Sequence, residues 1–112
     1  MPDRASKTFD ESCLTMAFTA SIPAAATTLV DDAKTRVTRW DFEPGASTGW
    51  HKHGMDYVVV PMTDCHFVLE EPGGQRSVFV KAGAAYSRLL GMEHNVINGG
   101  DALMSFIEVE IK

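Results

Sequence analysis

The sequence predicts an all-β fold, either a sandwich or a barrel. Apolar and polar side chains alternate in short runs from Arg36 onward, Gly- and Pro-containing turns separate these runs, and hardly any segment has helical spacing. About eight short strands joined by such turns are typical of a small β-sandwich or barrel. The expected strands are residues 36–42, 50–53, 57–62, 66–70, 75–80, 84–88, 93–98 and 103–111.

Each expected strand follows from its alternation and from the residues that end it. The first places Thr38, Trp40 and Phe42 on one face, and the run Glu-Pro-Gly after Phe42 ends it. Pro61 indicates that the third strand ends at an edge or a bulge. The turn Glu-Pro-Gly-Gly at residues 71–74 predicts a hairpin between the fourth and fifth strands. In the last strand, odd-numbered and even-numbered residues face opposite ways.

The first thirty residues differ from the rest. We expect residues 1–30 to form an N-terminal arm and residues 31–112 to form one β-barrel domain. Thr-Phe-Asp-Glu at residues 8–11 matches a capping box and predicts a short helix over about residues 9–17; an arm without regular structure is the alternative. Residues 14–26 resemble a secretory signal only loosely, because two acidic residues interrupt its basic region.

Composition excludes several classes of protein. The chain has 112 residues with 45% hydrophobic and 22% charged side chains, which suits one domain with a single core. Fifteen acidic against ten basic residues give a net charge of −5, without the basic stripe of a nucleic-acid binder. No apolar run reaches the length that crosses a bilayer. Cys13 and Cys65 form no CxxC pair, so a reduced, cytoplasmic protein is expected.

The four histidines are the clearest candidates for chemistry. His51 and His53 are two residues apart, which on a strand puts both rings on one face with Cα atoms roughly 7 Å apart. Two rings at that spacing can converge on one cation, but they are also compatible with two half-exposed polar residues after a turn. His94 follows a glycine onto another expected strand, whereas His66 belongs to the hairpin and is expected at the surface.

The sequence around these histidines resembles the cupin superfamily. Gly45 to His53 reads G-x5-H-x-H, and Gly83 to Asn98 reads G-x5-L-x-G-x2-H-x3-N, which together match the two cupin motifs in order. The run from Trp50 to Asp64 is further similar to small single-domain cupins linked to β-alanine degradation. The resemblance implies a double-stranded β-helix, or jelly-roll barrel, in which His51, His53 and His94 bind one divalent metal ion. It also implies a homodimer.

Two departures from the cupin pattern affect the expected ligands. The glutamate of the first motif should stand where this chain has Tyr57 and Val58, and the closing glycine is replaced at residues 64 and 65. Asp56 is the nearest carboxylate, but an offset of one residue reverses the side-chain direction on a strand, so an acid outside the site is favoured. The expected metal ligands are therefore three neutral histidines. Leu89 replaces a proline and reduces turn rigidity.

Residues near the second motif are candidates for binding a substrate. Tyr86 and Arg88 alternate toward one face, and an inward arginine is costly unless it meets an anion. The alternative is an arginine that turns to solvent or pairs with a nearby acid. We predict Arg88, Tyr86 and Met92 as substrate-binding residues, with Tyr86 and Tyr57 as candidate catalytic residues.

The function that this pattern favours is a metal-dependent enzyme, oxygenase-like, acting on a small carboxylate or another chelating metabolite. The sequence does not distinguish Fe, Zn, Ni, Mn and Cu, all of which imidazole can bind. A non-catalytic metal-dependent module that binds or senses a small anionic ligand is the alternative, because one fold hosts both functions. A β-sandwich without a metal is the third and least favoured interpretation.

Overall fold

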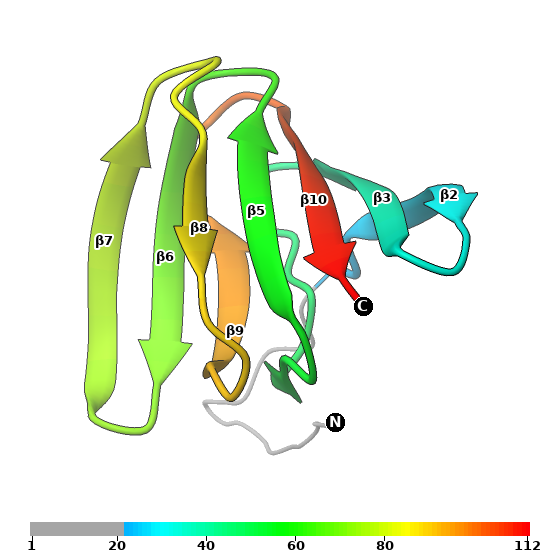
Figure 1. Ribbon diagram of the computed structural model, residues 1–112. Helices are drawn as coiled ribbons and strands as arrows, with labels where there is room; N and C mark the ends of the chain where they lie inside the picture. Colours follow the sequence, from blue (N-terminus) through cyan, green and yellow to red (C-terminus); the bar gives the residue numbers. More distant parts are fainter. Residues whose placement is uncertain (1–21) are drawn as a thin grey trace.

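The computed structural model describes residues 22–112, and all regular structure in this range is β (Figure 1). This confirms the predicted all-β class. No helix within the range has the length and apolar character that a membrane crossing needs. The described strands are β2 (Ala25–Asp31), β3 (Thr35–Phe42), β4 (His51–Lys52), β5 (Asp56–Pro61), β6 (Cys65–Glu71), β7 (Gly74–Val80), β8 (Tyr86–Arg88), β9 (Glu93–Asn98) and β10 (Met104–Ile111).

Two antiparallel sheets face each other. One has the order β2-β3-β10-β5-β8 and the other β4-β9-β6-β7. The strand β10 lies between β3 and β5, and its register places Glu108 opposite Thr38 on one side and Val59 on the other. Strands distant in sequence are therefore neighbours in both sheets, as in the jelly-roll barrel that the sequence predicts.

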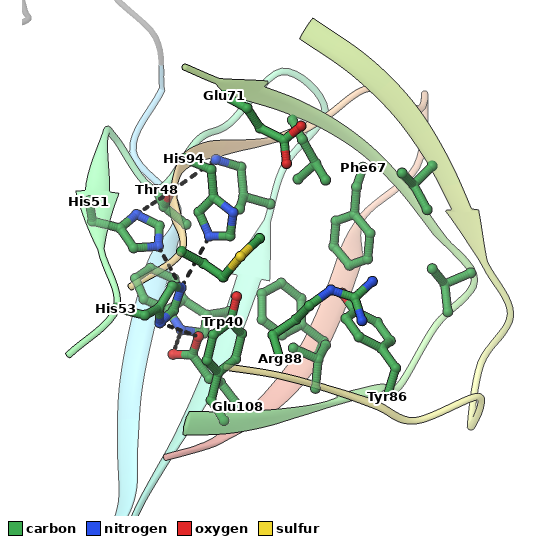
Figure 2. Close-up of a pocket in the computed structure, with 18 of the residues that line it drawn as sticks. Trp40, Thr48, His51, His53, Phe67, Glu71, Tyr86, Arg88, His94 and Glu108 are labelled. Carbon is green, nitrogen blue, oxygen red and sulfur yellow. Dashed lines mark hydrogen bonds and ion pairs between the residues drawn. The ribbon is translucent and has the colours of Figure 1, made fainter. Parts of the chain in front are cut away.

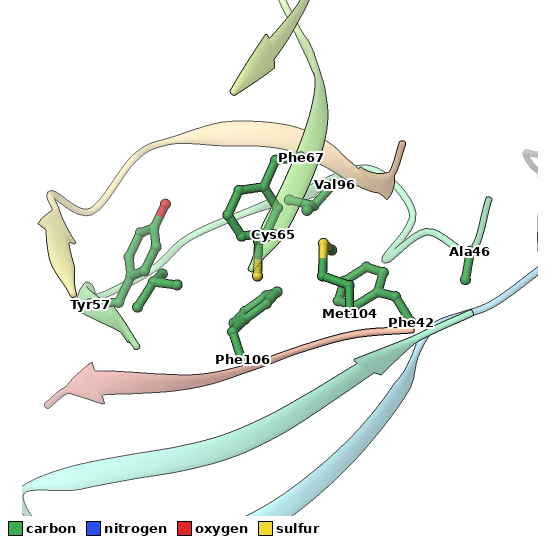
Figure 3. Close-up of a cluster of buried hydrophobic side chains, with 9 residues drawn as sticks. Phe42, Ala46, Tyr57, Cys65, Phe67, Val96, Met104 and Phe106 are labelled. Atoms are coloured by element: carbon green, nitrogen blue, oxygen red, sulfur yellow. The ribbon is translucent and has the colours of Figure 1, made fainter. Parts of the chain in front are cut away.

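The apolar core lies between the sheets and forms one wall of a cavity. Phe42 and Phe106 project from the larger sheet with ring centroids 5.6 Å apart, and Phe67 of the smaller sheet meets Phe106 edge-on at 5.6 Å (Figure 3). Each such side chain contributes about 2 kcal/mol by leaving water. The buried hydrophobic residues are Phe42, Ala46, Tyr57, Val59, Cys65, Phe67, Val96, Met104 and Phe106.

One strand was not expected from the sequence. Residues 25–30, which we assigned to an N-terminal arm, belong to β2 and pair with β3 in a register that runs from Ala25 opposite Asp41 to Asp31 opposite Arg36. Every residue of β2 is exposed, so neither face of this strand requires apolar side chains. Its sequence therefore lacks the alternation of apolar and polar residues by which the other strands were identified. The expected helix over about residues 9–17 lies outside the described residues, and the expected homodimer stays a prediction.

Candidate metal centre

Three histidine rings meet inside the barrel (Figure 2). His51 lies on β4 and His94 on β9, where the two residues are direct partners across the strands, while His53 follows β4 directly. The Nε2 atoms of His51 and His53 are 3.1 Å apart, and the Nε2 atoms of His53 and His94 are also 3.1 Å apart. The three rings therefore converge in the structure, as the sequence analysis expects.

Backbone hydrogen bonds hold His53 against the loop that leads to His94. The His53 amide donates to the Met92 carbonyl at 2.9 Å, and the Gly91 amide donates to the His53 carbonyl at 2.7 Å. Gly91 has a φ of 92°, a conformation that a residue with a Cβ atom rarely adopts. The glycine of the second motif thus permits the turn that brings the two ligand segments together.

The orientation of the His51 ring is set by its Nδ1 atom. This nitrogen lies 2.9 Å from the Gly49 carbonyl oxygen, which can only accept, so Nδ1 carries the proton and Nε2 presents its lone pair to the cluster. Gly49 has a φ of 82°, which turns its carbonyl toward the ring. The Thr48 hydroxyl fixes the same turn, because it donates to the Gly49 carbonyl and accepts from the Val96 amide.

Burial keeps the other two rings uncharged. The pKa of His53 is lowered to about 4, first by burial and then by the neighbouring His51 and His94. The pKa of His94 is also lowered to about 4, again first by burial and then by His51. Both imidazoles are therefore neutral at pH 7, which is the form that binds a metal ion.

The spacing of the three nitrogens suits a divalent metal ion. Metal–nitrogen bonds of about 2.0–2.1 Å put neighbouring ligand atoms about 3.0 Å apart at right angles and about 3.4 Å apart at tetrahedral angles. The separations of 3.1 Å between His53 Nε2 and the Nε2 atoms of His51 and His94 fall within this range. Lone pairs this close repel one another unless a cation or a proton lies between them, so the donor set fits the metal that the fold family implies.

Tyr57 replaces the carboxylate that the cupin pattern places in the first motif. Its ring stacks on the His53 ring, with centroids 3.8 Å apart and an interplanar angle of 16°. Only 3% of Tyr57 is exposed, and burial, together with the nearby Glu108, raises its pKa to about 12. Tyr57 therefore orients an imidazole and keeps its own proton at neutral pH.

Glu108 is a site residue that sequence reasoning missed. It points from β10 into the barrel, where its Oε2 lies 3.8 Å from His53 Nδ1 and its Oε1 accepts from the Trp40 indole at 3.3 Å (Figure 2). Burial raises the pKa of Glu108 to about 7, against the opposing effect of the Trp40 hydrogen bond. A charged residue on the same strand face as Met104 and Phe106 was a signal available in the sequence.

The cluster opens into a cavity of about 290 Å³ between the sheets. Tyr86, Arg88 and Met92, the predicted substrate-binding residues, all line this cavity, and their binding role stays a prediction. The Arg88 guanidinium lies over the Tyr86 ring at 4.7 Å and donates to the Ser87 carbonyl. Burial raises the pKa of Tyr86, although Arg88 opposes this shift.

The second arginine on the cavity wall is already paired. Arg76 donates from Nε and Nη2 to the two carboxylate oxygens of Glu71, at 2.8 and 3.2 Å. Arg88 has no carboxylate within ion-pair distance among residues 22–112, including the nearby acids with which the sequence alternative would have paired it. Arg88 is exposed, as the solvent-facing alternative expected, and it is the cavity-lining arginine without an acidic partner among the described residues.

Two other candidates lie outside the cluster. Asp56 is exposed, and its Oδ1 accepts from the Leu90 amide at 2.8 Å, so it holds the loop before β9. His66 stacks on Phe79 with ring centroids 4.1 Å apart and takes no part in the cluster. Both lie outside the cluster, as the sequence analysis favoured; Asp56 is exposed, whereas His66 is half-buried against Phe79.

Comparison with known proteins identifies the family. No protein-family model matches the sequence. The β-alanine degradation protein BauB of Pseudomonas aeruginosa is 53% identical over 89 residues, which cover 80% of this chain and 94% of BauB. The crystal structure of a cupin domain from Bordetella pertussis is 47% identical, with a TM-score of 0.80 over 82% of this chain and 96% of that domain. The chain belongs to the cupin family.

More distant structures support the fold of this cupin. A protein with a double-stranded β-helix domain from Klebsiella pneumoniae superposes with a TM-score of 0.67 at 18% identity, over 80% of this cupin and 76% of that chain. Such low identity shows a shared architecture alone. The resemblance that the two histidine motifs indicated, and the jelly-roll fold that it implied, are confirmed.

Proposed function

We propose that this cupin binds one divalent metal ion through His51, His53 and His94 and acts as an oxygenase-like enzyme on a small carboxylate. One observation carries the metal site: the Nε2 atom of His53 lies 3.1 Å from the Nε2 atoms of both His51 and His94, and burial keeps the rings of His53 and His94 neutral. An ion bound there would supply Lewis-acid or redox chemistry, with open positions for a chelating substrate.

The cavity supports a small anionic substrate. Its volume of about 290 Å³ is at the lower end of small-molecule pockets, and its apolar wall would exclude water from the bound molecule. Arg88 would receive a carboxylate as the lining cation without an acidic partner, and Tyr86 lies beneath the guanidinium. The name of the Pseudomonas aeruginosa relative supports a carboxylate of about the size of β-alanine.

The side chains of the cavity favour chemistry in which no tyrosine acts as a base. Tyr57 and Tyr86 both have raised pKa values, so their phenols can donate hydrogen bonds but hold their protons at pH 7. A dioxygenase reaction suits such a cavity, because both atoms of dioxygen enter the substrate and no external reductant is consumed. A binding or sensing module would use the same cavity without turnover.

Metal analysis followed by oxygen consumption tests this proposal. Protein purified without a histidine tag should hold one divalent ion per chain, and the iron-loaded form should consume dioxygen with β-alanine or another small acid from a panel. His94→Ala should abolish both properties. Absence of stoichiometric metal binding would overturn the site. Stoichiometric metal binding without oxygen consumption across the panel would overturn the oxygenase and leave the binding module.

A further inference from the structure

The outer nitrogens of the cluster have different partners. His51 donates its Nδ1 proton to a backbone carbonyl that the turn at Gly49 fixes in place. His53 instead directs Nδ1 toward the carboxylate of Glu108, with 3.8 Å between Nδ1 and Oε2. That separation is beyond hydrogen-bond range, and a side-chain movement of about 1 Å closes it. One ring thus has a neutral partner, and another has an acid.

Glu108 is held where it can serve this role. Only 9% of the residue is exposed, and its position at the middle of β10, opposite Thr38 and Val59, is fixed by ladders on both sides. The Trp40 indole donates to Oε1 and leaves Oε2 directed at His53. A buried carboxylate without partners is costly, so its two oxygens are expected to engage these two groups.

We propose that Glu108 is a positioning residue that acts through His53 on the metal site. By accepting the Nδ1 proton, it selects the tautomer whose Nε2 lone pair faces His51 and His94. It also places a carboxylate beside a site whose proposed ligands are all neutral. Outer partners of this kind increase the basicity of a ligating imidazole, and their loss typically lowers metal affinity by about 10–100-fold. The inference rests on the proposed metal site.

Zinc affinity in the full chain tests this role. Competition with a chromophoric chelator should show that Glu108→Gln binds one Zn(II) per chain about 10–100-fold more weakly than the wild type. Glu110→Gln is the matched control, because it removes the same charge two residues further along the same strand. The control should change Zn(II) affinity by less than about 2-fold, because Glu110 is less buried than Glu108 and water screens its more distant charge.

Two further measurements separate positioning from a structural role. The visible absorption bands of the Co(II)-loaded protein should shift in Glu108→Gln and not in Glu110→Gln, because the ligand field depends on the His53 donor. Trp40→Phe keeps the carboxylate but removes the donor that orients it, and should weaken Zn(II) binding by a few-fold. This variant decides the question if Glu108→Gln does not fold.

The outcomes for the two proposals are distinct. Wild-type Zn(II) affinity and an unshifted Co(II) spectrum in Glu108→Gln would overturn the positioning role while the metal site stands. Equal losses in Glu108→Gln and Glu110→Gln would also overturn it, because the effect would then be one of overall charge. A wild-type protein that binds neither Zn(II) nor Co(II) would overturn the metal site itself.

Discussion

The cluster of His51, His53 and His94 and the single His66 put the same side chain into opposite environments. The cluster rings point into the barrel, where two of them are less than 9% exposed. On β6, Cys65 and Phe67 point inward, so the alternation of the strand turns His66 outward onto the exposed ring of Phe79. The difference shows that strand parity, more than residue type, decides which histidine can take part in chemistry.

The largest expected effect is on metal binding. His94→Ala removes one of three converging donors, so metal affinity should fall by at least about 100-fold, while His66→Ala should leave it unchanged. Saturating metal, at about 100 times its dissociation constant, should stabilise the wild type and His66→Ala by about 2.7 kcal/mol and should not stabilise His94→Ala. Elemental analysis and thermal unfolding with and without metal check both statements. Equal metal content in the two variants would show that His94 is no more a metal ligand than His66 is.

The pH dependence of unfolding should also separate the cluster from the surface. In metal-free protein, His53 and His94 have pKa values lowered to about 4, so the unfolded chain takes up their protons first as the pH falls below 6.5. Stability contributed by these rings is full above pH 6.5 and is lost toward pH 4. Glu108 acts in the opposite direction, because its pKa of about 7 lets the folded state bind a proton before the unfolded state does.

Glu108→Gln removes the contribution of the glutamate to the pH dependence and leaves that of the two histidines. Between pH 6 and 5, the unfolded wild type holds about two extra histidine protons and the folded state about one extra glutamate proton, so the variant should lose stability about twice as steeply. Urea unfolding midpoints measured in the presence of a chelator give both slopes. Parallel slopes in the two proteins would show that Glu108 does not bind its proton preferentially in the folded state.

A substitution beside His66 should affect stability without affecting the cluster. A Cβ atom at Gly99 would lie 2.5 Å from Val68 Cγ2 and 3.1 Å from His66 Nε2, so Gly99→Ala forces both side chains to move. We expect it to lower the free energy of unfolding by about 1–3 kcal/mol, as overpacking does. Zn(II) affinity should stay at the wild-type value, and a parallel loss of affinity would mean that the two regions are coupled.

The smallest expected effect is on anion binding in the cavity. Arg88→Leu removes the unpaired cation but none of the three histidines, so affinity for malonate should fall by about 10-fold with metal content unchanged. Isothermal titration of the metal-loaded protein measures this affinity. Gln75→Leu on the exposed edge strand β7 is a suitable control, because this residue does not line the cavity. Unchanged malonate affinity in Arg88→Leu would assign the arginine to the surface.

Much of the fold could be predicted from local pattern. The predicted bounds of residues 93–98 coincide with β9, and those of 36–42 differ from β3 by one residue at the start. The alternation of apolar and polar residues suffices to predict β3 and β9 because one face of each strand is buried. It fails for β2, whose two faces are both exposed, and pairing with β3 determines that strand instead.

The sequence by itself determined which histidines share a strand face and that a glycine precedes His94, because both depend on residues a few positions apart. Only the tertiary structure decided that Glu108, Trp40 and His53 meet, since they lie on or beside three segments whose contact depends on strand order and register. The pairing of Arg76 with Glu71, by contrast, is local, because the two residues are five positions apart in the β6–β7 hairpin. Side-chain direction is a local property of a strand, whereas the identity of the facing residue is set by the closure of the whole barrel.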